Sequence, residues 1–300
     1  MGTEKRKKIT FGRIAALCVS LLLILSLTLS LVWDGYYPFW DSLFRRSGLR
    51  SEKAASFDKV IFLDVGQGDC SLIASRDKYI LIDTGPSDRA VSTARELQRL
   101  CQGRIDTVVI SHPHQDHIGG LAALLGEVEI GRIILGGNPP TEAEDISARD
   151  AALSLAEKAG VAVSAAPLTL RQGNCELRFF EAEEDASDND ASLVIRAAFD
   201  SGLTALFTGD CSAERLEALG RDDLHCDLLK VPHHGAESSV SEELYNDIMP
   251  RFAVISCGEY NPYGHPSDAV TEMLEKNSVT YRRTDVNGTV TFSVKDMKFI

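Results

Sequence analysis

A six-residue motif in the middle of the chain constrains the fold more than any other feature. Residues 112–117, HPHQDH, place three histidines and a carboxylate directly after an apolar, strand-like run. Clustered imidazoles repel each other when protonated, and they are costly to leave unpaired in a core. A metal removes both costs, because zinc binds such nitrogen and oxygen ligands and leaves a position open for water in catalytic sites. We therefore expect a metal centre, with His112 and His114 directed at one ion and Asp116 and His117 at a second.

Four further polar residues stand at the same place relative to a predicted strand as the HPHQDH motif does. Asp210, His233, His234 and His265 each follow an apolar run that predicts a strand. Taken singly, such residues are more often helix caps or loop residues than ligands. Because all of them stand at the carboxyl ends of predicted strands, as the HPHQDH motif does, we expect them to share one site at one edge of the sheets.

Strand-like and helical patterns alternate from residue 59 onward. Predicted strands cover residues 60–65, 70–75, 79–83, 106–111, 175–180, 192–199, 203–208, 227–231 and 252–256. Predicted helices cover residues 87–102, 212–220, 241–249 and 267–276. The chain has two β-rich halves, and each is followed by helices. This pattern predicts two sheets packed face to face, with helices outside. The chain is expected to close on a β-hairpin around Asn287-Gly288.

The amino terminus predicts a membrane anchor. Five Lys or Arg residues precede an apolar run at 14–33, which is long enough as a helix to span the hydrocarbon layer of about 30 Å. The basic residues indicate that the amino terminus stays inside and the rest of the chain lies outside. We therefore expect a tail and single-pass signal anchor at 1–33, a linker at 34–57, and an extracytoplasmic domain at 58–300. A cleaved signal peptide, which would make the domain secreted, is the alternative.

Charge and cysteine content limit the possible partners. Of the 31 basic and 44 acidic residues, five and one lie in 1–33, which leaves a formal net charge of −17 on the remainder. An acidic body does not suit a protein that binds polyanions through a broad basic face. None of the seven cysteines forms a CxxC pair. Most lie in or beside apolar runs, so we expect them to act as small buried hydrophobes.

The motif at 112–117 is similar to the HxHxDH signature of the metallo-β-lactamase superfamily. Flanking segments resemble the hydrolase domain of ComEC-type competence proteins, and together with the motif they span roughly residues 58–295. These segments are LDVGQGD at 63–69, LIDTG at 81–85, TGD at 208–210, KVPHHG at 230–235 and YGHP at 263–266.

The resemblance implies an α+β fold, a four-layer αββα sandwich that here follows one amino-terminal transmembrane helix. It also implies one or two Zn²⁺ ions at one edge of the sandwich. Asp210 would bridge the two ions, and either His233 or His234 would complete the second site.

The same resemblance implies roles for residues around the metal ligands. Lys230 and His265 would join Asp116 as catalytic groups, placed for substrate or for protonation of the leaving group. Residues behind the ligands would orient the histidines; these are Asp64, Asp69, Asp83 and Asn189.

Two departures from the family pattern matter. Many members supply another histidine to the first ion from mid-chain, yet no histidine occurs between His117 and His225. Asn189 or Asp190 takes that position, so the first site would be weak and Mn²⁺ is an alternative to zinc. ComEC-type proteins also carry many membrane spans that form a DNA channel, whereas one span is predicted here, so the chain by itself would form no channel.

These features together predict a metallo-hydrolase that uses metal-activated water, most suitably on a phosphodiester. The substrate would be nucleic acid, a cell-envelope polymer or a choline- or nucleotide-type headgroup. A carbonyl hydrolase acting on a lactone, thioester or β-lactam is one alternative, and a non-catalytic metal-bearing binding module is another. A redox di-iron enzyme is less suited, because a Glu ligand is expected at a place where this sequence has Asn or Gln neighbours.

Overall fold

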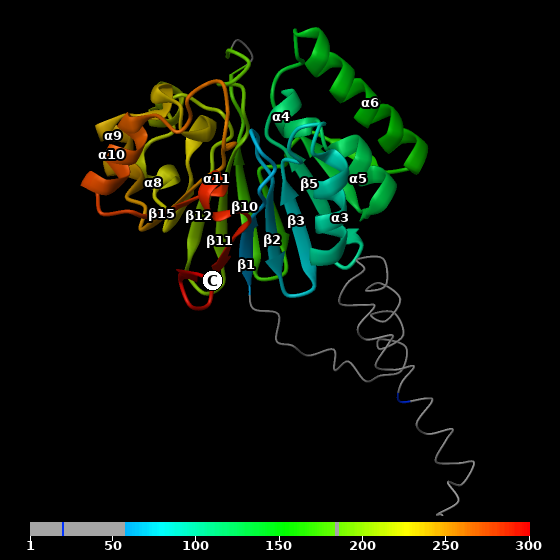
Figure 1. Cartoon of the computed structure of the whole chain (residues 1–300), viewed down its shortest axis with the longest axis horizontal. Helices are drawn as coiled ribbons and strands as arrows, with labels where there is room; N and C mark the ends of the chain where they lie inside the picture. The colour runs from blue at the N-terminus through cyan, green and yellow to red at the C-terminus, as the bar shows by residue number, and fades with distance from the viewer. Residues whose placement is uncertain (1–19, 21–57, 184–185) are drawn as a thin grey trace, which may run out of the picture. The chain divides into compact units, whose positions relative to one another are not determined.

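The structure, a computed structural model, describes residue 20, residues 58–183 and residues 186–300 (Figure 1). The predicted tail, anchor and linker at 1–57 lie outside the described residues, apart from Ser20. In the described part of the chain, no helix is long and apolar enough to cross a membrane. The chain divides into two compact units, and the one described here is Ser56–Ile300.

An eight-stranded sheet forms one layer of this unit. Its strand order is β17-β16-β1-β2-β3-β5-β7-β8. β1, β2 and β3 form an antiparallel meander, and β3, β5, β7 and β8 run parallel. The strands are β1 (Lys59–Phe62), β2 (Ser71–Ser75), β3 (Lys78–Ile82), β5 (Thr107–Ile110), β7 (Arg132–Leu135), β8 (Ala162–Ser164), β16 (Val290–Ser293) and β17 (Lys298–Phe299).

A seven-stranded sheet forms the facing layer, in the order β15-β14-β13-β12-β11-β10-β9. β9 to β12 are antiparallel, and β12 to β15 are parallel. The strands are β9 (Thr169–Gln172), β10 (Cys175–Phe180), β11 (Val194–Phe199), β12 (Thr204–Phe207), β13 (Leu228–Lys230), β14 (Phe252–Ile255) and β15 (Thr280–Arg283). A small separate ladder pairs β4 (Arg104–Ile105) with β6 (Glu129–Ile130).

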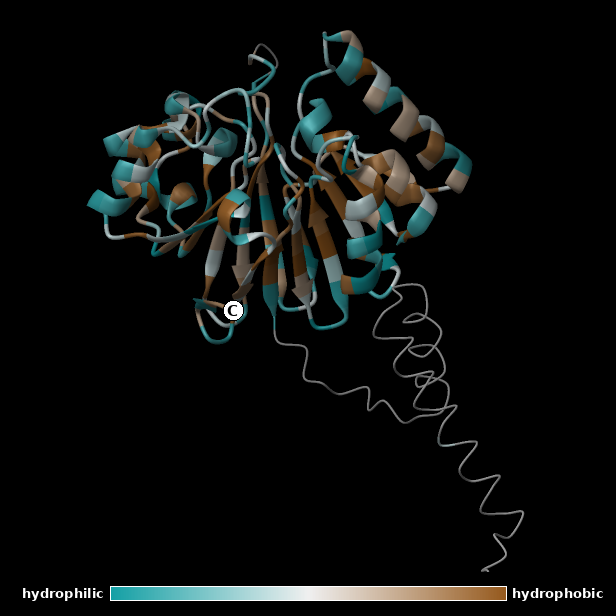
Figure 2. Ribbon diagram, in the orientation of Figure 1, coloured by the Kyte–Doolittle hydropathy of each residue, from teal (hydrophilic) through white to brown (hydrophobic). Residues whose placement is uncertain are grey.

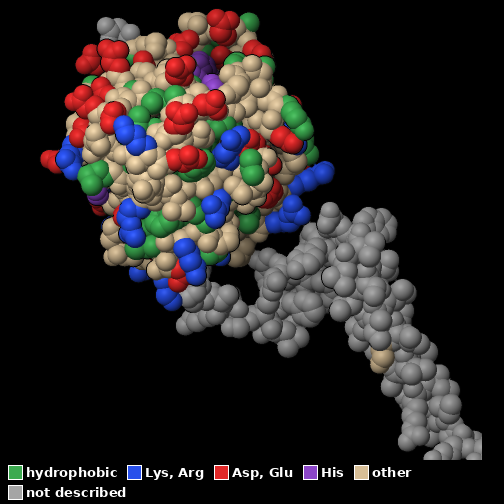
Figure 3. All heavy atoms as spheres, turned by 60° about the vertical axis from the view of Figure 1, so that its left-hand side comes forward, with side chains coloured by type: hydrophobic (Ala, Val, Ile, Leu, Met, Phe, Trp, Pro, Cys, Tyr) green, Lys and Arg blue, Asp and Glu red, His purple; other side chains and the backbone are tan. Residues whose placement is uncertain are grey.

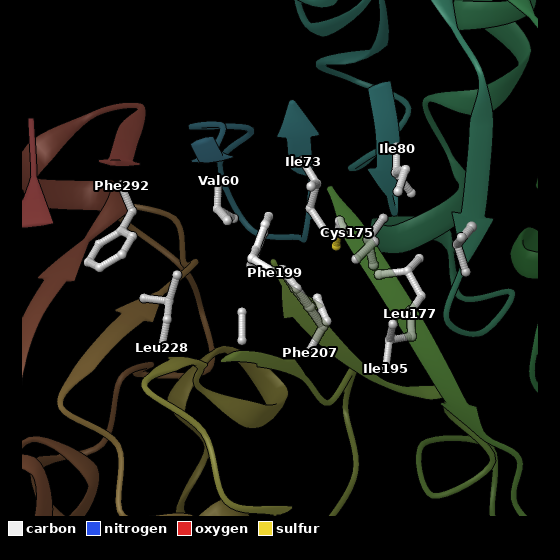
Figure 4. Packing of buried hydrophobic residues seen from close by; sticks show 14 of the residues in the cluster. Val60, Ile73, Ile80, Cys175, Leu177, Ile195, Phe199, Phe207, Leu228 and Phe292 are labelled. Carbon is white, nitrogen blue, oxygen red and sulfur yellow. The ribbon is translucent and has the colours of Figure 1, made fainter. Parts of the chain in front are cut away.

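The two sheets enclose one apolar core between them. Val60 and Phe62 of β1 face this core, whereas Ile61, between them, faces the helices outside. Successive strand side chains point to opposite faces, so a strand buried on both faces must be apolar throughout. Figure 4 shows Val60 and other side chains of the eight-stranded sheet opposite Phe207 and Leu228 of the seven-stranded sheet.

Helices cover the outer face of each sheet, as Figure 1 shows. α3 (Ala90–Leu100), α5 (Leu121–Glu127) and α6 (Ala143–Ala159) pack on the eight-stranded sheet. The seven-stranded sheet is covered by α7 (Ala213–Glu217), α8 (Arg221–Leu224), α9 (Glu242–Ile248) and α10 (Asp268–Lys276). Apolar colour concentrates on the strands and polar colour on the outer helices (Figure 2). The predicted αββα sandwich is confirmed.

Helix starts follow the local sequence. The hydroxyls of Ser212, Ser241 and Ser267 cap α7, α9 and α10 by accepting a hydrogen bond from a backbone N–H three residues on. These three helices begin within one residue of where the sequence predicts them.

The predicted closing hairpin is wrong. β15 pairs with β14 in the seven-stranded sheet, whereas β16 pairs with β1 in the eight-stranded sheet. The short helix α11 (Thr284–Asn287) connects them and contains Asn287. Asn-Gly favours a hairpin turn locally, but each flanking strand gains more by extending a different sheet.

The sequence interpretation also left the region around α5, α6, β7, β8 and β9 unassigned, although it is regular structure. Six cysteines of the described chain are buried and free, as expected of small hydrophobes. They are Cys70, Cys101, Cys175, Cys211, Cys226 and Cys257.

Candidate metal centre

The loop that follows β5 carries the HPHQDH motif. The chain turns there into the one-turn helix α4 (Gln115–Ile118), and the backbone N–H of His117 donates to the carbonyl of His114 at 2.9 Å. The neighbouring loop passes very close, because a Cβ at Gly68 would lie 2.4 Å from the carbonyl oxygen of Asp116. A glycine is therefore required at that position, and the motif is held tightly against the loop that follows β1.

The seven-stranded sheet supplies the opposing ligands from two adjacent strand ends. Asp210 follows β12, and its backbone N–H donates to the hydroxyl of Ser192 at 3.1 Å. After β13, His233 and His234 both adopt left-handed backbone conformations, with φ of 47° and 53°. Such conformations are uncommon outside glycine and mark functional turns in many proteins. Here they direct two successive imidazoles to the same edge of the sandwich.

Four of these residues converge, and we call them the metal cluster: Asp116, His117, Asp210 and His234. Each offers one ligand atom, and the four atoms lie within 4.8 Å of one another. His117 Nε2 lies 3.2 Å from Asp210 Oδ1, and His234 Nε2 lies 3.2 Å from Asp116 Oδ2. His117, Asp210 and His234 are buried, so the cluster opens to solvent on the side of Asp116.

The cluster fits a divalent cation. His117 Nε2, Asp210 Oδ1 and His234 Nε2 are buried but make no hydrogen bond within the described part of the chain. They lie within 4.8 Å of one another and at ion-pair distance from other cluster atoms, yet they lack the hydrogen-bond partner that buried polar atoms nearly always have, so the arrangement requires another explanation. Two imidazole nitrogens and two carboxylates form a donor set that zinc binds, at distances of about 2.0–2.2 Å.

His112 and His114 form a second, smaller group, which we call the histidine pair. His112 Nε2 lies 3.0 Å from His114 Nδ1, and the ring of His112 lies 4.2 Å from that of His117. Burial, together with the charge of His117, lowers the pKa of His112 well below its ordinary value. His112 is therefore a neutral imidazole, the form that binds metals.

A carboxylate lies behind each histidine of the metal cluster. Asp83 Oδ2 lies 2.9 Å from His117 Nδ1, and the same carboxylate accepts hydrogen bonds from the N–H and hydroxyl of Ser111 at 2.7 and 2.8 Å. His234 Nδ1 lies 3.0 Å from the carbonyl of Ser256 and 3.3 Å from Asp69 Oδ1. In both cases Nδ1 is the donor, so Nε2 is left to bind a metal.

The electrostatics of the metal cluster are strongly coupled. Burial opposes charge on His117, yet the carboxylates of Asp210, Asp116 and Asp83 raise its pKa well above the ordinary value. Burial likewise opposes ionisation of Asp210, but His117 and His234 hold its pKa well below the usual range. The carboxylates are thus stabilised by positive charge beside them, which can be imidazolium protons or a bound cation.

Two residues with predicted roles lie elsewhere than expected. The side chain of Lys230 is 2% exposed and its ammonium lies 2.7 Å from Asp69 Oδ2, so it is buried and does not face a substrate. Asp64 is exposed, and its side chain accepts a hydrogen bond from the backbone N–H of Gly66. Within the described part of the chain, its side chain makes no hydrogen bond to a ligand histidine. The short loop after β1 directs Asp69 inward and Asp64 outward.

The remaining predicted residues lie around the metal cluster. Asn189 is half-buried and accepts a hydrogen bond through its carbonyl from Ser192, while the Asp190 carboxylate accepts one from the N–H of Ser212. His233 is partly exposed, with Nε2 3.7 Å from Asp210 Oδ2. The ring of His265 lies 5.8 Å from that of His233, so these two histidines form a rim beside the metal cluster.

Sequence reasoning missed three serines that organise the site. Ser111 supports Asp83, Ser192 supports Asp210, and the carbonyl of Ser256 orients His234. Each stands at the end or start of a predicted strand, which places it near the site. Their residue type carries no signal, because serine is common at such positions.

With this geometry established, comparison with known proteins identifies the domain. Residues 63–172 match the profile of the Metallo-beta-lactamase superfamily. The chain contains a metallo-β-lactamase domain. The matched residues include the HPHQDH motif and Asp69, and members of this superfamily are generally hydrolases that bind divalent metals.

Curated relatives of the metallo-β-lactamase domain are competence proteins. The chain is 30% identical over 203 residues to ComE operon protein 3 of Bacillus subtilis (strain 168), a match that covers 64% of this chain and 25% of that protein. It is 31% identical over 196 residues to Competence protein ComA of Neisseria gonorrhoeae, covering 64% and 26%. The match thus spans about a quarter of the length of these relatives.

A solved structure supports the fold. The metallo-β-lactamase fold protein YhfI from Bacillus subtilis superposes with a TM-score of 0.50 at 14% identity, covering 75% of this chain and 96% of that one. At this identity the likeness concerns the fold alone. The domain therefore has the superfamily's architecture and a ComEC-type sequence, as the motifs predict.

Proposed function

We propose that the chain is a divalent-metal-dependent hydrolase that cleaves phosphodiesters at the edge of the sandwich. The observation that carries the proposal is the convergence of Asp116, His117, Asp210 and His234, with three buried ligand atoms that make no hydrogen bond among the described residues. A purely structural cluster of this kind would have its polar atoms paired. Zn²⁺ is the ion that the mixed nitrogen and oxygen ligands favour, with Mn²⁺ as the alternative.

When bound, such an ion lowers the pKa of water to near 7 and stabilises negative charge on the attacked phosphoryl group. The protein's own groups hold the reaction in place. Asp210 presents one oxygen to His117 and the other toward His233 and His234, so it would help to hold a bound ion through its carboxylate. Asp116, the most exposed cluster member, is placed to orient the attacking water.

The nucleophile in this proposal is water. The hydroxyls of Ser111 and Ser192 are the serine groups that contact this site in the described chain, and both are held in hydrogen bonds. The water oxygen bonds to phosphorus, its proton is taken up by a site carboxylate or imidazole, and the bond from phosphorus to the ester oxygen breaks. The leaving oxygen then takes a proton, which His265 or His233 on the rim can donate.

A phosphodiester is the substrate class that these observations favour. If the metal cluster and the histidine pair each held an ion, the two ions would stabilise both the attacking and the leaving oxygens of an in-line displacement. The relatives are named as a ComE operon protein and a competence protein, and neither name refers to a β-lactam. Figure 3 shows acidic side chains gathered around the histidines, with Lys and Arg more frequent toward the opposite end. Such surroundings favour a small or locally bound substrate over a long duplex.

We further propose that the domain acts outside the cytoplasm, carried by the predicted anchor at 14–33. The activities of the far longer relatives belong to those proteins, and the proposal for this chain covers hydrolysis alone.

The test is hydrolysis of bis-p-nitrophenyl phosphate by the purified full-length chain, together with elemental analysis of bound metal. The expected result is turnover that a chelator abolishes and that Zn²⁺ or Mn²⁺ restores. The variant Asp116→Ala should be inactive, whereas His225→Ala should retain full activity, because His225 is an exposed histidine that is not part of the site. Hydrolysis of a β-lactam or thioester with no phosphodiester turnover would overturn the substrate class. Absence of bound metal after reconstitution would overturn the proposal as a whole.

A further inference from the structure

Lys230 is a buried lysine, and the burial of its charge needs a physical explanation. It ends β13, three residues before His233, and is among the largest fully buried side chains of the described chain. Lysine is almost never fully buried unless its charge is paired. The ammonium lies 2.7 Å from Asp69 Oδ2 and donates to the carbonyl of Val231 at 2.9 Å. Its charged partner in the described part of the chain is therefore Asp69, which lies in the loop between two strands of the other sheet.

Asp69 connects the loops that form the metal cluster. Its backbone N–H donates to the carbonyl of Asp116 at 3.2 Å, and its own carbonyl accepts from the N–H of Gly85 at 2.8 Å. Its side chain is 5% exposed and extends across to the seven-stranded sheet, where Lys230 lies. One residue thus links the HPHQDH loop, the loop after β3 and the strand that leads to His234.

The two oxygens of Asp69 have different partners. Oδ2 pairs with the ammonium of Lys230. Oδ1 makes no hydrogen bond within the described part of the chain and lies 3.3 Å from His234 Nδ1, whose own hydrogen bond goes to the carbonyl of Ser256 at 3.0 Å. The bond to Lys230 fixes the rotation of the carboxylate, so that the negative charge of Oδ1 faces the imidazole beside its hydrogen bond to Ser256. His234 Nε2, on the opposite side of the ring, then faces Asp116 and Asp210.

The equivalent support on the other side of the cluster is built differently. Asp83, behind His117, is held by two neutral donors from Ser111. Asp69 has no such neutral side-chain donor among the described residues and depends on a cation. A buried carboxylate without hydrogen bonds or an opposite charge is strongly destabilised, so Lys230 does for Asp69 what Ser111 does for Asp83.

We propose that Lys230 is a positioning residue for metal binding, which acts through Asp69 to hold His234 as a ligand of a divalent cation. This inference rests on the proposed metal centre and assigns to Lys230 no contact with substrate. Partners that orient a metal-binding histidine typically change metal affinity by about 10–100-fold when they are lost.

The experiment compares Zn²⁺ affinity, measured by competition with a chromophoric chelator, in three variants of the full-length chain. Lys230→Met keeps the length of the side chain and removes its charge. The double variant Lys230→Met/Asp69→Asn removes both buried charges and protects against a failure of the single variant to fold. Lys78→Met is the matched control, because Lys78 forms a lysine–aspartate pair with Asp106 at 3.0 Å, at the amino end of β5 and away from the site.

The expected result is a loss of Zn²⁺ affinity of about 10–100-fold in the Lys230 variants and none in Lys78→Met. NMR of the histidine rings should show the Nδ1–H signal of His234 altered and that of His117 preserved, which a general loss of structure would not produce. Wild-type affinity in the double variant, or equal changes at both histidines, would overturn the inference. Failure of the wild-type chain to bind Zn²⁺ would instead overturn the proposed function.

Discussion

The metal cluster and the histidine pair lie side by side, yet they are built in different ways. The cluster takes Asp116 and His117 from the loop after β5 and Asp210 and His234 from the facing sheet. The pair takes both its residues, His112 and His114, from the single loop after β5. The cluster therefore offers four ligands and exists only when both sheets are assembled, whereas the pair offers two and is local. We infer that the cluster is the tighter metal site and that its ion stabilises the packing of the two sheets.

The largest effect on metal binding is expected from replacing Asp210, the residue that both proposed ions would share. Asp210→Ala should lower Zn²⁺ affinity by more than about 100-fold, beyond the effect of losing a supporting partner, and should abolish hydrolysis. It should also remove the rise in melting temperature that Zn²⁺ gives the wild type, because a ligand stabilises only the state that binds it. Calorimetry with and without Zn²⁺ measures this, with His225→Ala as the control. A variant that still gains stability from Zn²⁺ would show that the cluster is not the tight site.

A smaller and more selective effect is expected from the pair. His114→Ala should reduce the bound metal from about two ions to about one while the remaining ion keeps its affinity, because the cluster retains its four ligands. Elemental analysis after equilibrium dialysis against saturating Zn²⁺ counts the ions. If His114→Ala instead loses all metal, the two groups act as one site and the comparison fails.

The support behind His117 should matter less than the ligands themselves. Asp83→Asn keeps the shape of the side chain but removes the charge that faces His117 Nδ1 at 2.9 Å. We expect Zn²⁺ affinity to fall by about 10–100-fold, with the number of ions at saturating Zn²⁺ unchanged. Isothermal titration measures both quantities. An unchanged affinity would mean that the hydrogen bonds around Ser111 suffice to orient the ring.

The smallest effect on metal binding is expected at Asp106, which is not part of the metal cluster or the histidine pair. Its replacement should change stability instead. Burial by itself would raise the pKa of Asp106, but the N–H of Tyr79 and the cations of Lys78 and Arg104 lower it below its ordinary value. A depressed folded-state pKa contributes stability above the unfolded-state pKa, and this contribution is lost as the pH falls through the folded-state value. Asp106→Asn should thus cost about 1–3 kcal/mol near neutral pH and little in acid.

Urea denaturation of wild type and Asp106→Asn at pH 7 and at pH 3 tests this prediction. Zn²⁺ affinity should be the same in both proteins. An equal loss of stability at the two pH values would show that packing, and not the charge of Asp106, is responsible.

The same contrast explains how much the sequence could predict. The loop after β5 concentrates its chemistry in six residues, so the motif indicates a metal site without any structure. Asp210 and His234 are recognisable only as polar residues after strands, and the sequence left the choice between His233 and His234 open. The structure places His234 Nε2 in the cluster, because the left-handed turn after β13 directs His234 inward and His233 to the rim.

The fold was predictable to a similar degree. Apolar runs identified most central strands, because strands buried on both faces are apolar throughout. The partner of an edge strand is set by long-range packing, which is why β15 and β16 were wrongly joined as a hairpin. Burial of Lys230 was equally hidden, since its partner Asp69 lies far away in the chain and in the other sheet.

The most direct test of the account is to locate the first metal ion that binds. Crystals of the full-length chain grown with one equivalent of Zn²⁺ would be measured at the zinc absorption edge. The account predicts one anomalous peak, in contact with Asp116, His117, Asp210 and His234. A peak between His112 and His114 with the cluster empty would contradict it, and would make the local loop, not the assembled sheets, the primary metal site.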